Sequence, residues 1–169
     1  EKHSKLSKDK CRYKGRAVFQ GNRVRDQDSN AAVFGEMSAS TCSMSAGKFL
    51  DVIGSLPGCS QQQCDATSAY IQAKLGGTPT WIHLPEDQWP KEWHGKFHNP
   101  VVRLRLALYG HPDSGAYWDR HCAAQLTKVG YEPIPNWDGC YVNRELGLVL
   151  IVYVDDFKHA GKTENLEEG

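Results

Sequence analysis

The sequence lacks an excess of charge of one sign, since Lys plus Arg and Asp plus Glu each number 20 in 169 residues. This balance gives no general electrostatic indication of a polyanionic partner. The chain also lacks an apolar run of the roughly 20 residues that a bilayer requires, so we expect no membrane span. Its charged start has neither an initial Met nor the apolar core of a signal peptide. We expect a fragment, a processed chain or an incomplete one.

Paired cysteine motifs are absent as well. None of the six cysteines forms the CxxC pair that is typical of zinc or redox sites. Cys59 and Cys64 lie close in sequence, but no second His or Cys pair follows at the spacing of a zinc finger. The even number permits disulfides, and free thiols in a reducing compartment are the simpler interpretation.

Positive charge gathers near the N-terminus although the net charge is zero. Lys and Arg occur there at Lys2, Lys5, Lys8, Lys10, Arg12, Lys14, Arg16, Arg23 and Arg25. We expect a basic flexible arm over residues 1–12, which either contacts phosphate or is a solvated tail. Glu164, Glu167 and Glu168 predict an acidic tail over residues 162–169.

The apolar periodicity predicts strands and helices that follow one another without βαβ regularity, which indicates an α+β fold. Helices are expected over 38–54, with Ser38 or Ser40 as the cap, over 65–75 and over 114–129. Residues 85–100 are expected to form a loop. Strands are expected over 13–20, 61–64, 80–84, 101–108, 140–142, 148–154 and 157–160.

The apolar strand expected over 148–154 stops at two adjacent carboxylates, Asp155 and Asp156. Like charges side by side repel, and their burial is costly unless a cation lies beside them. Mg²⁺ prefers such oxygen ligands, whereas an ordinary hairpin turn is the alternative. Asp65, between a short strand and a predicted helix, can add a third carboxylate or simply cap that helix.

Short motifs spread along the chain form an ordered series from about residue 11 to 161. They are Tyr13-Lys14-Gly15-Arg16-Ala17-Val18, Gln63-Cys64-Asp65-Ala66-Thr67-Ser68-Ala69-Tyr70, Trp81-Ile82-His83-Leu84-Pro85, Ala107-Leu108-Tyr109-Gly110, Ala116-Tyr117-Trp118, Asp138-Gly139-Cys140-Tyr141-Val142 and Tyr153-Val154-Asp155-Asp156. In this order they resemble the reverse transcriptase domain of Ty1/copia-type long-terminal-repeat retrotransposons.

The resemblance implies a fingers–palm fragment over residues 13–161, with an antiparallel palm sheet packed on helices and an end soon after the catalytic hairpin. It implies an RNA-directed DNA polymerase that joins a deoxynucleotide to the 3′-hydroxyl of a primer on an RNA or DNA template. Against that family the rest of the palm, the thumb and the ribonuclease H domain are missing, so we expect this incomplete domain to be weak or inactive alone. Asp65, Asp155 and Asp156 would hold two Mg²⁺ ions, the arrangement of two-metal nucleotidyl transfer. The implied location is the cytoplasm or the nucleus.

The resemblance also implies contacts to the incoming nucleotide. Arg16 would contact the triphosphate as a planar fork, or be a solvated arginine at a strand edge. The backbone N–H groups of Ala66, Thr67, Ser68 and Ala69 would meet the triphosphate at a helix start. Tyr70 would lie under the sugar and exclude a 2′-hydroxyl, or be an ordinary core aromatic.

Tyr109 and Gly110 would lie by the nucleotide or template, and Tyr153 near the primer end. The segment after Gly110 departs from the family pattern, because Pro112 and Asp113 stand where Lys and Gln are usual. A carboxylate there is unfavourable for a polyanion.

A non-catalytic subunit of a host assembly, derived from a retrotransposon, is therefore the alternative function. That alternative predicts exposed tryptophans that a partner protein covers. The four candidates are Trp81, Trp89, Trp93 and Trp137.

Overall fold

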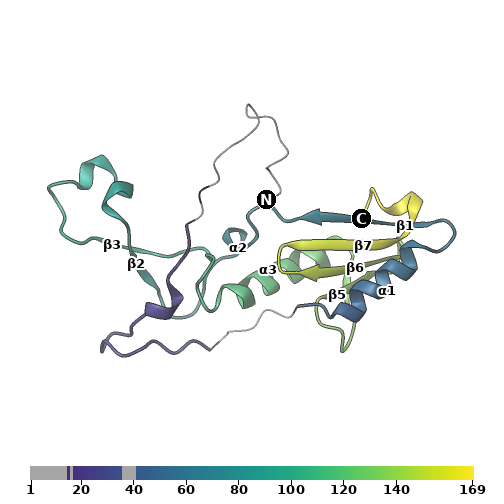
Figure 1. The fold of residues 1–169 in the computed structure, drawn as a ribbon, viewed down its shortest axis with the longest axis horizontal. Coiled ribbons are helices and arrows are strands. Elements are labelled where there is room, and N and C mark those ends of the chain that lie inside the picture. The colour runs from purple at the N-terminus through teal and green to yellow at the C-terminus, as the bar shows by residue number, and fades with distance from the viewer. Residues whose placement is uncertain (1–14, 16, 36–40) are drawn as a thin grey trace.

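The computed structural model, which describes residues 15, 17–35 and 41–169, contains a five-stranded antiparallel sheet (Figure 1). Its strand order is β1-β7-β6-β5-β4. The strands are β1 (Cys59–Asp65), β4 (Glu132–Pro133), β5 (Cys140–Asn143), β6 (Leu148–Tyr153) and β7 (Asp156–Lys162). The helices are α1 (Met44–Gly54), α2 (Ala69–Gln72) and α3 (Ser114–Lys128). The α+β class and the antiparallel sheet are confirmed.

Both faces of the sheet are covered. Alternate residues of a strand point to opposite faces, so one strand contributes side chains to both. Leu148, Leu150 and Val152 of β6 belong to one apolar cluster, which also contains side chains of α3. Ile151, which lies between two of them, belongs to a second cluster with side chains of α1. The sheet therefore has an α3 face and an α1 face.

Helix α1 begins later than the sequence predicted. Its N-cap is Ser43, whose Oγ accepts a hydrogen bond of 3.2 Å from the backbone N–H of Ala46. The expected caps, Ser38 and Ser40, lie outside the described residues, but a helix that begins at Met44 cannot use either of them. Gly54 ends the helix, as predicted, and Ala46 and Leu50 are fully buried against the sheet.

Helix α3 agrees with the prediction to within one residue. Its buried side chains Trp118, Cys122 and Leu126 are spaced four residues apart and so form one stripe. Gly130 follows with a φ of +85°, the left-handed conformation that commonly ends a helix. No helix in the described part of the chain is long and apolar enough to cross a membrane.

The helix predicted over 65–75 is wrong for most of its length, because Asp65 stays in the sheet and Ser68 has a φ of +56°. Only Ala69–Gln72 is α-helical there. A left-handed residue interrupts helical hydrogen bonding, and β1 pairing competes for the residues before it.

Two predicted strands are also shorter or absent. Residues 15 and 17–20 form no strand, and Tyr13, Lys14 and Arg16 lie outside the described residues. The strand expected over 101–108 is only β3 (Val101–Arg103), which pairs with β2 (Trp81–His83) in a two-stranded ribbon. Among the described residues, four short 3₁₀-helices lie at Gly21–Arg23, Glu86–Gln88, Lys91–Trp93 and Thr163–Asn165.

The segment predicted as an acidic tail is attached to the body of the protein. Leu166 is 5% exposed and belongs to the cluster on the α3 face. The Asn165 side chain donates a hydrogen bond of 2.7 Å to the Leu146 carbonyl. The domain boundaries themselves, 1–12, 13–161 and 162–169, stay predictions. The cysteines of the described residues are free thiols, as the sequence suggested.

His111 joins the loop of residues 17–35 to the ribbon and to α3. Its Nδ1 accepts a hydrogen bond from the Asp113 backbone N–H, so Nε2 carries the proton and donates to Thr80 Oγ1 at 3.1 Å. Phe19 and Phe34 pack against the ring, with centroids 5.1 and 5.3 Å away. Burial lowers the pKa of His111, although the nearby Asp113 carboxylate opposes this shift.

We expect Leu50→Ala to lower the free energy of unfolding by about 2–5 kcal/mol, because it opens a cavity under α1. The matched control is Val52→Ala in the same helix, where the side chain is 61% exposed. That change should stay within about 0.5 kcal/mol. Urea unfolding followed by circular dichroism measures both changes. Equal losses of stability in the two variants would contradict the placement of Leu50 on the buried face of α1.

The free energy of unfolding should fall as the pH drops below about 6.5, the ordinary pKa of histidine. The folded pKa of His111 is lowered, so the unfolded state binds the proton first and gains stability. His111→Leu should make this pH dependence shallower, whereas His98→Gln, at an exposed position, should leave it unchanged. Urea titrations between pH 5 and 8 measure the slope.

Candidate functional site

Three aspartates lie at one end of the sheet. Asp65 is the last residue of β1 and Asp156 the first of β7, and the strand register places them directly opposite each other. Tyr153, the last residue of β6, lies opposite Asp156 on its other side. Asp155 lies in the tight turn between β6 and β7. The sheet thus brings together residues that are far apart in the sequence.

The side chains of Asp65, Asp156 and Tyr153 share the α1 face of the sheet, because residues paired across strands point to the same side. An open hollow of about 490 Å³ lies between this end of β6 and β7 and the first turns of α1. Tyr153 and Lys158 line it, and the Lys158 ammonium forms an ion pair of 2.5 Å with Asp51. Asp65 and Asp156 are exposed.

The Asp155 carboxylate is directed elsewhere. Its Oδ2 accepts a hydrogen bond of 3.2 Å from the Tyr109 hydroxyl. The Tyr109 ring packs edge-on against Tyr70 with centroids 4.4 Å apart, and Tyr70 packs on the α3-face cluster. Among the residues that the structure describes, no group of three His, Cys, Asp or Glu side chains is placed to hold a metal ion. The expected cage of Asp65, Asp155 and Asp156 is not assembled in this arrangement.

The turn between β6 and β7 is strained and well held. Val154 has a φ of +59°, which is a true outlier for a β-branched residue and costs about 1–3 kcal/mol. The Trp118 indole N–H donates to the Val154 carbonyl, and the Ala66 N–H donates to the Asp155 carbonyl at 2.7 Å. Trp118 belongs to one of the motifs found in the sequence, but no role was predicted for it. Its hydrogen-bond partner is the Val154 backbone carbonyl, which lies far away in the sequence.

The helix start expected at Ala66–Ala69 does not exist in that form. The Ala66 N–H is already bonded to Asp155, and Thr67 and Ser68 form a turn before α2. Ala69 is the first helical residue and is fully buried. The capping interpretation of Asp65 is wrong too, because the N-cap of α2 is Ser68. A contact of these residues with a triphosphate stays a prediction.

Tyr70 is half-buried beside the turn, so its ring partly serves the core. Burial raises the pKa of its hydroxyl, and the negative charges of Asp155 and Asp119 raise it further. The side chain is therefore a neutral hydroxyl at physiological pH. Its role in excluding a 2′-hydroxyl stays a prediction.

Tyr109 and Gly110 are fixed by a close backbone approach. The Phe19 N–H donates to the Tyr109 carbonyl at 2.7 Å, and a Cβ at position 110 would lie 2.0 Å from the Phe19 carbonyl oxygen. Gly110 also has a φ of +91°, so glycine is required there. Arg16 lies outside the described residues.

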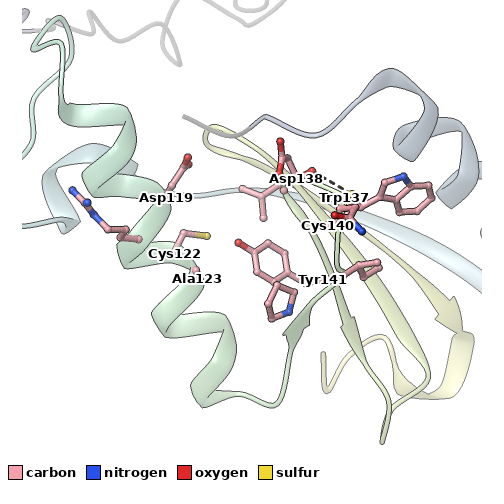
Figure 2. A pocket seen from close by; sticks show the side chains of 13 residues that line it. Asp119, Cys122, Ala123, Trp137, Asp138, Cys140 and Tyr141 are labelled. Atoms are coloured by element: carbon pink, nitrogen blue, oxygen red, sulfur yellow. Dashed lines mark hydrogen bonds between the residues drawn. The ribbon is translucent and has the colours of Figure 1, made fainter. Parts of the chain in front are cut away.

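A separate cavity of about 300 Å³ lies between α3 and β5 (Figure 2). Figure 2 shows the Cys122 thiol and the Tyr141 hydroxyl directed toward each other, with Asp119 and Asp138 at the rim. Burial, with the nearby Cys122, Asp119 and Cys140, raises the pKa of Tyr141 to about 12. Of the residues predicted for the site, none is among the described residues that line this cavity.

We expect Val154→Gly to raise the free energy of unfolding by roughly 1 kcal/mol, because glycine adopts a positive φ without strain. Val149→Gly is the matched control, a half-buried valine of the regular strand β6. That change should lower stability by about 2 kcal/mol. Equal losses in both variants, measured by urea unfolding, would show that the turn stores no strain.

The model of the family described as reverse transcriptase (RNA-dependent DNA polymerase) matches residues 1–168. No solved structure matches the chain significantly. The matched region includes the strand end with Asp65 and the hairpin with Asp155 and Asp156. The chain therefore belongs to the reverse transcriptase family.

Proposed function

We propose that this chain is a Ty1/copia-type reverse transcriptase domain that joins a deoxynucleoside triphosphate to the 3′-hydroxyl of a primer on an RNA or DNA template. One observation carries the proposal: the β1–β7 register places Asp65 opposite Asp156 beside the turn that holds Asp155. A family match over residues 1–168 supports it. The same relation suggests an intracellular location, in the cytoplasm or nucleus.

Mg²⁺ is the proposed cofactor, because the carboxylates offer only oxygen ligands. In the arrangement described, Asp155 is bonded to Tyr109, so the fit to an ion is incomplete. All three carboxylates would bind one ion only after the Asp155 side chain rotates toward Asp65 and Asp156. Such an ion would supply charge neutralisation for phosphoryl chemistry.

The remaining roles belong to side chains around the carboxylates. Tyr70 would contact the sugar and Tyr153 the primer end. Tyr153 is 55% exposed, so it is available for such a contact. Arg16 is proposed for the triphosphate on the family pattern alone.

The alternative of a non-catalytic subunit is not supported by the family match, and only two of the four tryptophans it relies on are exposed. Trp81 and Trp137 are 59% and 37% exposed, whereas Trp89 and Trp93 are half-buried. The Trp89 indole N–H donates to the Leu84 carbonyl, so this ring is engaged within the chain. The expectation of four exposed tryptophans is therefore wrong for two of them.

Primer extension with template, primer, deoxynucleotides and Mg²⁺ tests the proposal. The wild-type chain should extend the primer, and Asp65→Asn or Asp155→Asn should each lower the rate by at least about 100-fold, because charge stabilisation is the main contribution expected. Asp87→Asn, at an exposed carboxylate of the 3₁₀-helix Glu86–Gln88, should change nothing. No extension, or extension unaffected by Asp155→Asn, would overturn the proposal.

A further inference from the structure

We propose that Tyr109 is a positioning residue that holds the Asp155 carboxylate away from Asp65 and Asp156, and so keeps the divalent-ion site from assembling. This inference rests on the proposed function, since it assigns a control to the same carboxylates. It also explains why the three aspartates at one end of the sheet form no ion site. Among the described residues, no group of three His, Cys, Asp or Glu side chains is placed to hold an ion.

The first argument is the direction of the side chains. Asp65 and Asp156 share the α1 face by strand register, whereas the Asp155 carboxylate accepts its hydrogen bond from a tyrosine that packs with Tyr70. Tyr70 contacts the cluster on the opposite, α3 face. The Asp155 carboxylate is therefore held toward a pair of tyrosines that packs on the α3 face.

The second argument is that Tyr109 is itself held in place. Its carbonyl accepts the Phe19 N–H at 2.7 Å, the next residue is a glycine in tight backbone contact, and its ring packs on Tyr70. A fixed hydroxyl donates to a carboxylate without losing much conformational freedom. A hydrogen bond to an ionised group is also roughly twice as strong as a neutral one.

The third argument concerns what must move. The backbone of the turn is fixed from both sides, by the Trp118 indole at Val154 and by the Ala66 N–H at Asp155. Rotation of the Asp155 side chain is therefore the change that brings its carboxylate toward the other two. Without a cation that rotation brings like charges together, so the Tyr109 bond favours the arrangement in which the Asp155 carboxylate stays apart from the other two.

Mn²⁺ is a suitable probe, because carboxylate oxygens bind it and its free form is measured directly by electron paramagnetic resonance. The full chain is titrated with Mn²⁺ as wild type, Tyr109→Phe, Asp155→Asn and the double variant. Tyr141→Phe is the matched control, since it also removes the hydroxyl of a half-buried tyrosine. The phenylalanine at 109 keeps the ring contact with Tyr70.

Tyr109→Phe should bind Mn²⁺ about tenfold more tightly than the wild type, because the hydrogen bond no longer competes with the ion. Asp155→Asn should remove that gain in the double variant, and Tyr141→Phe should match the wild type. Equal or weaker binding by Tyr109→Phe, or a gain that survives Asp155→Asn, would overturn the inference. The absence of Mn²⁺ binding in every variant would overturn it too. Because binding is measured without primer or nucleotide, failure of the proposed polymerase activity would appear separately, in the extension assay.

Discussion

The antiparallel pairing of β7 with both β1 and β6 is the interaction on which the rest of the structure depends. β7 lies between a strand from the first half of the chain and its own hairpin partner (Figure 1). This pairing places Asp156 between Asp65 and Tyr153 and aligns Gln62, His159 and Leu150 further along the sheet. A shift of one residue would move every side chain of β1 to the other face and separate the carboxylates.

The two faces of the sheet have different consequences for the site. The α1 face carries two exposed carboxylates beside an open hollow, and so is accessible to a ligand. The α3 face supplies the supports: Trp118 holds the strained turn, and Tyr70 and Tyr109 hold the remaining carboxylate. The order of the site thus depends on contacts from α2, α3 and the loop before α3 rather than on the sheet alone.

Sequence patterns predicted the elements whose own periodicity decides their structure. The four-residue spacing of buried side chains defines α3, and the apolar run before Asp155 defines β6. Patterns failed where a neighbouring segment competes. Asp65 and Ala66 pair with the β6–β7 hairpin instead of starting a helix. The strand expected over 101–108 is limited to Val101–Arg103, because only these residues pair with β2. No sequence pattern assigned a role to His111, yet it connects three segments through Thr80, Asp113 and two phenylalanines.

The sequence by itself determined the family and the α+β class, because motif order and apolar periodicity are visible without coordinates. It also predicted three acidic residues for the chemistry, from the abrupt end of an apolar strand. Only the tertiary structure decided which of these carboxylates face one another. The reason is that a side chain's direction depends on strand register and on partners far away in the chain. Tyr109 lies far from Asp155 in sequence, and no local pattern predicts that its hydroxyl meets that carboxylate.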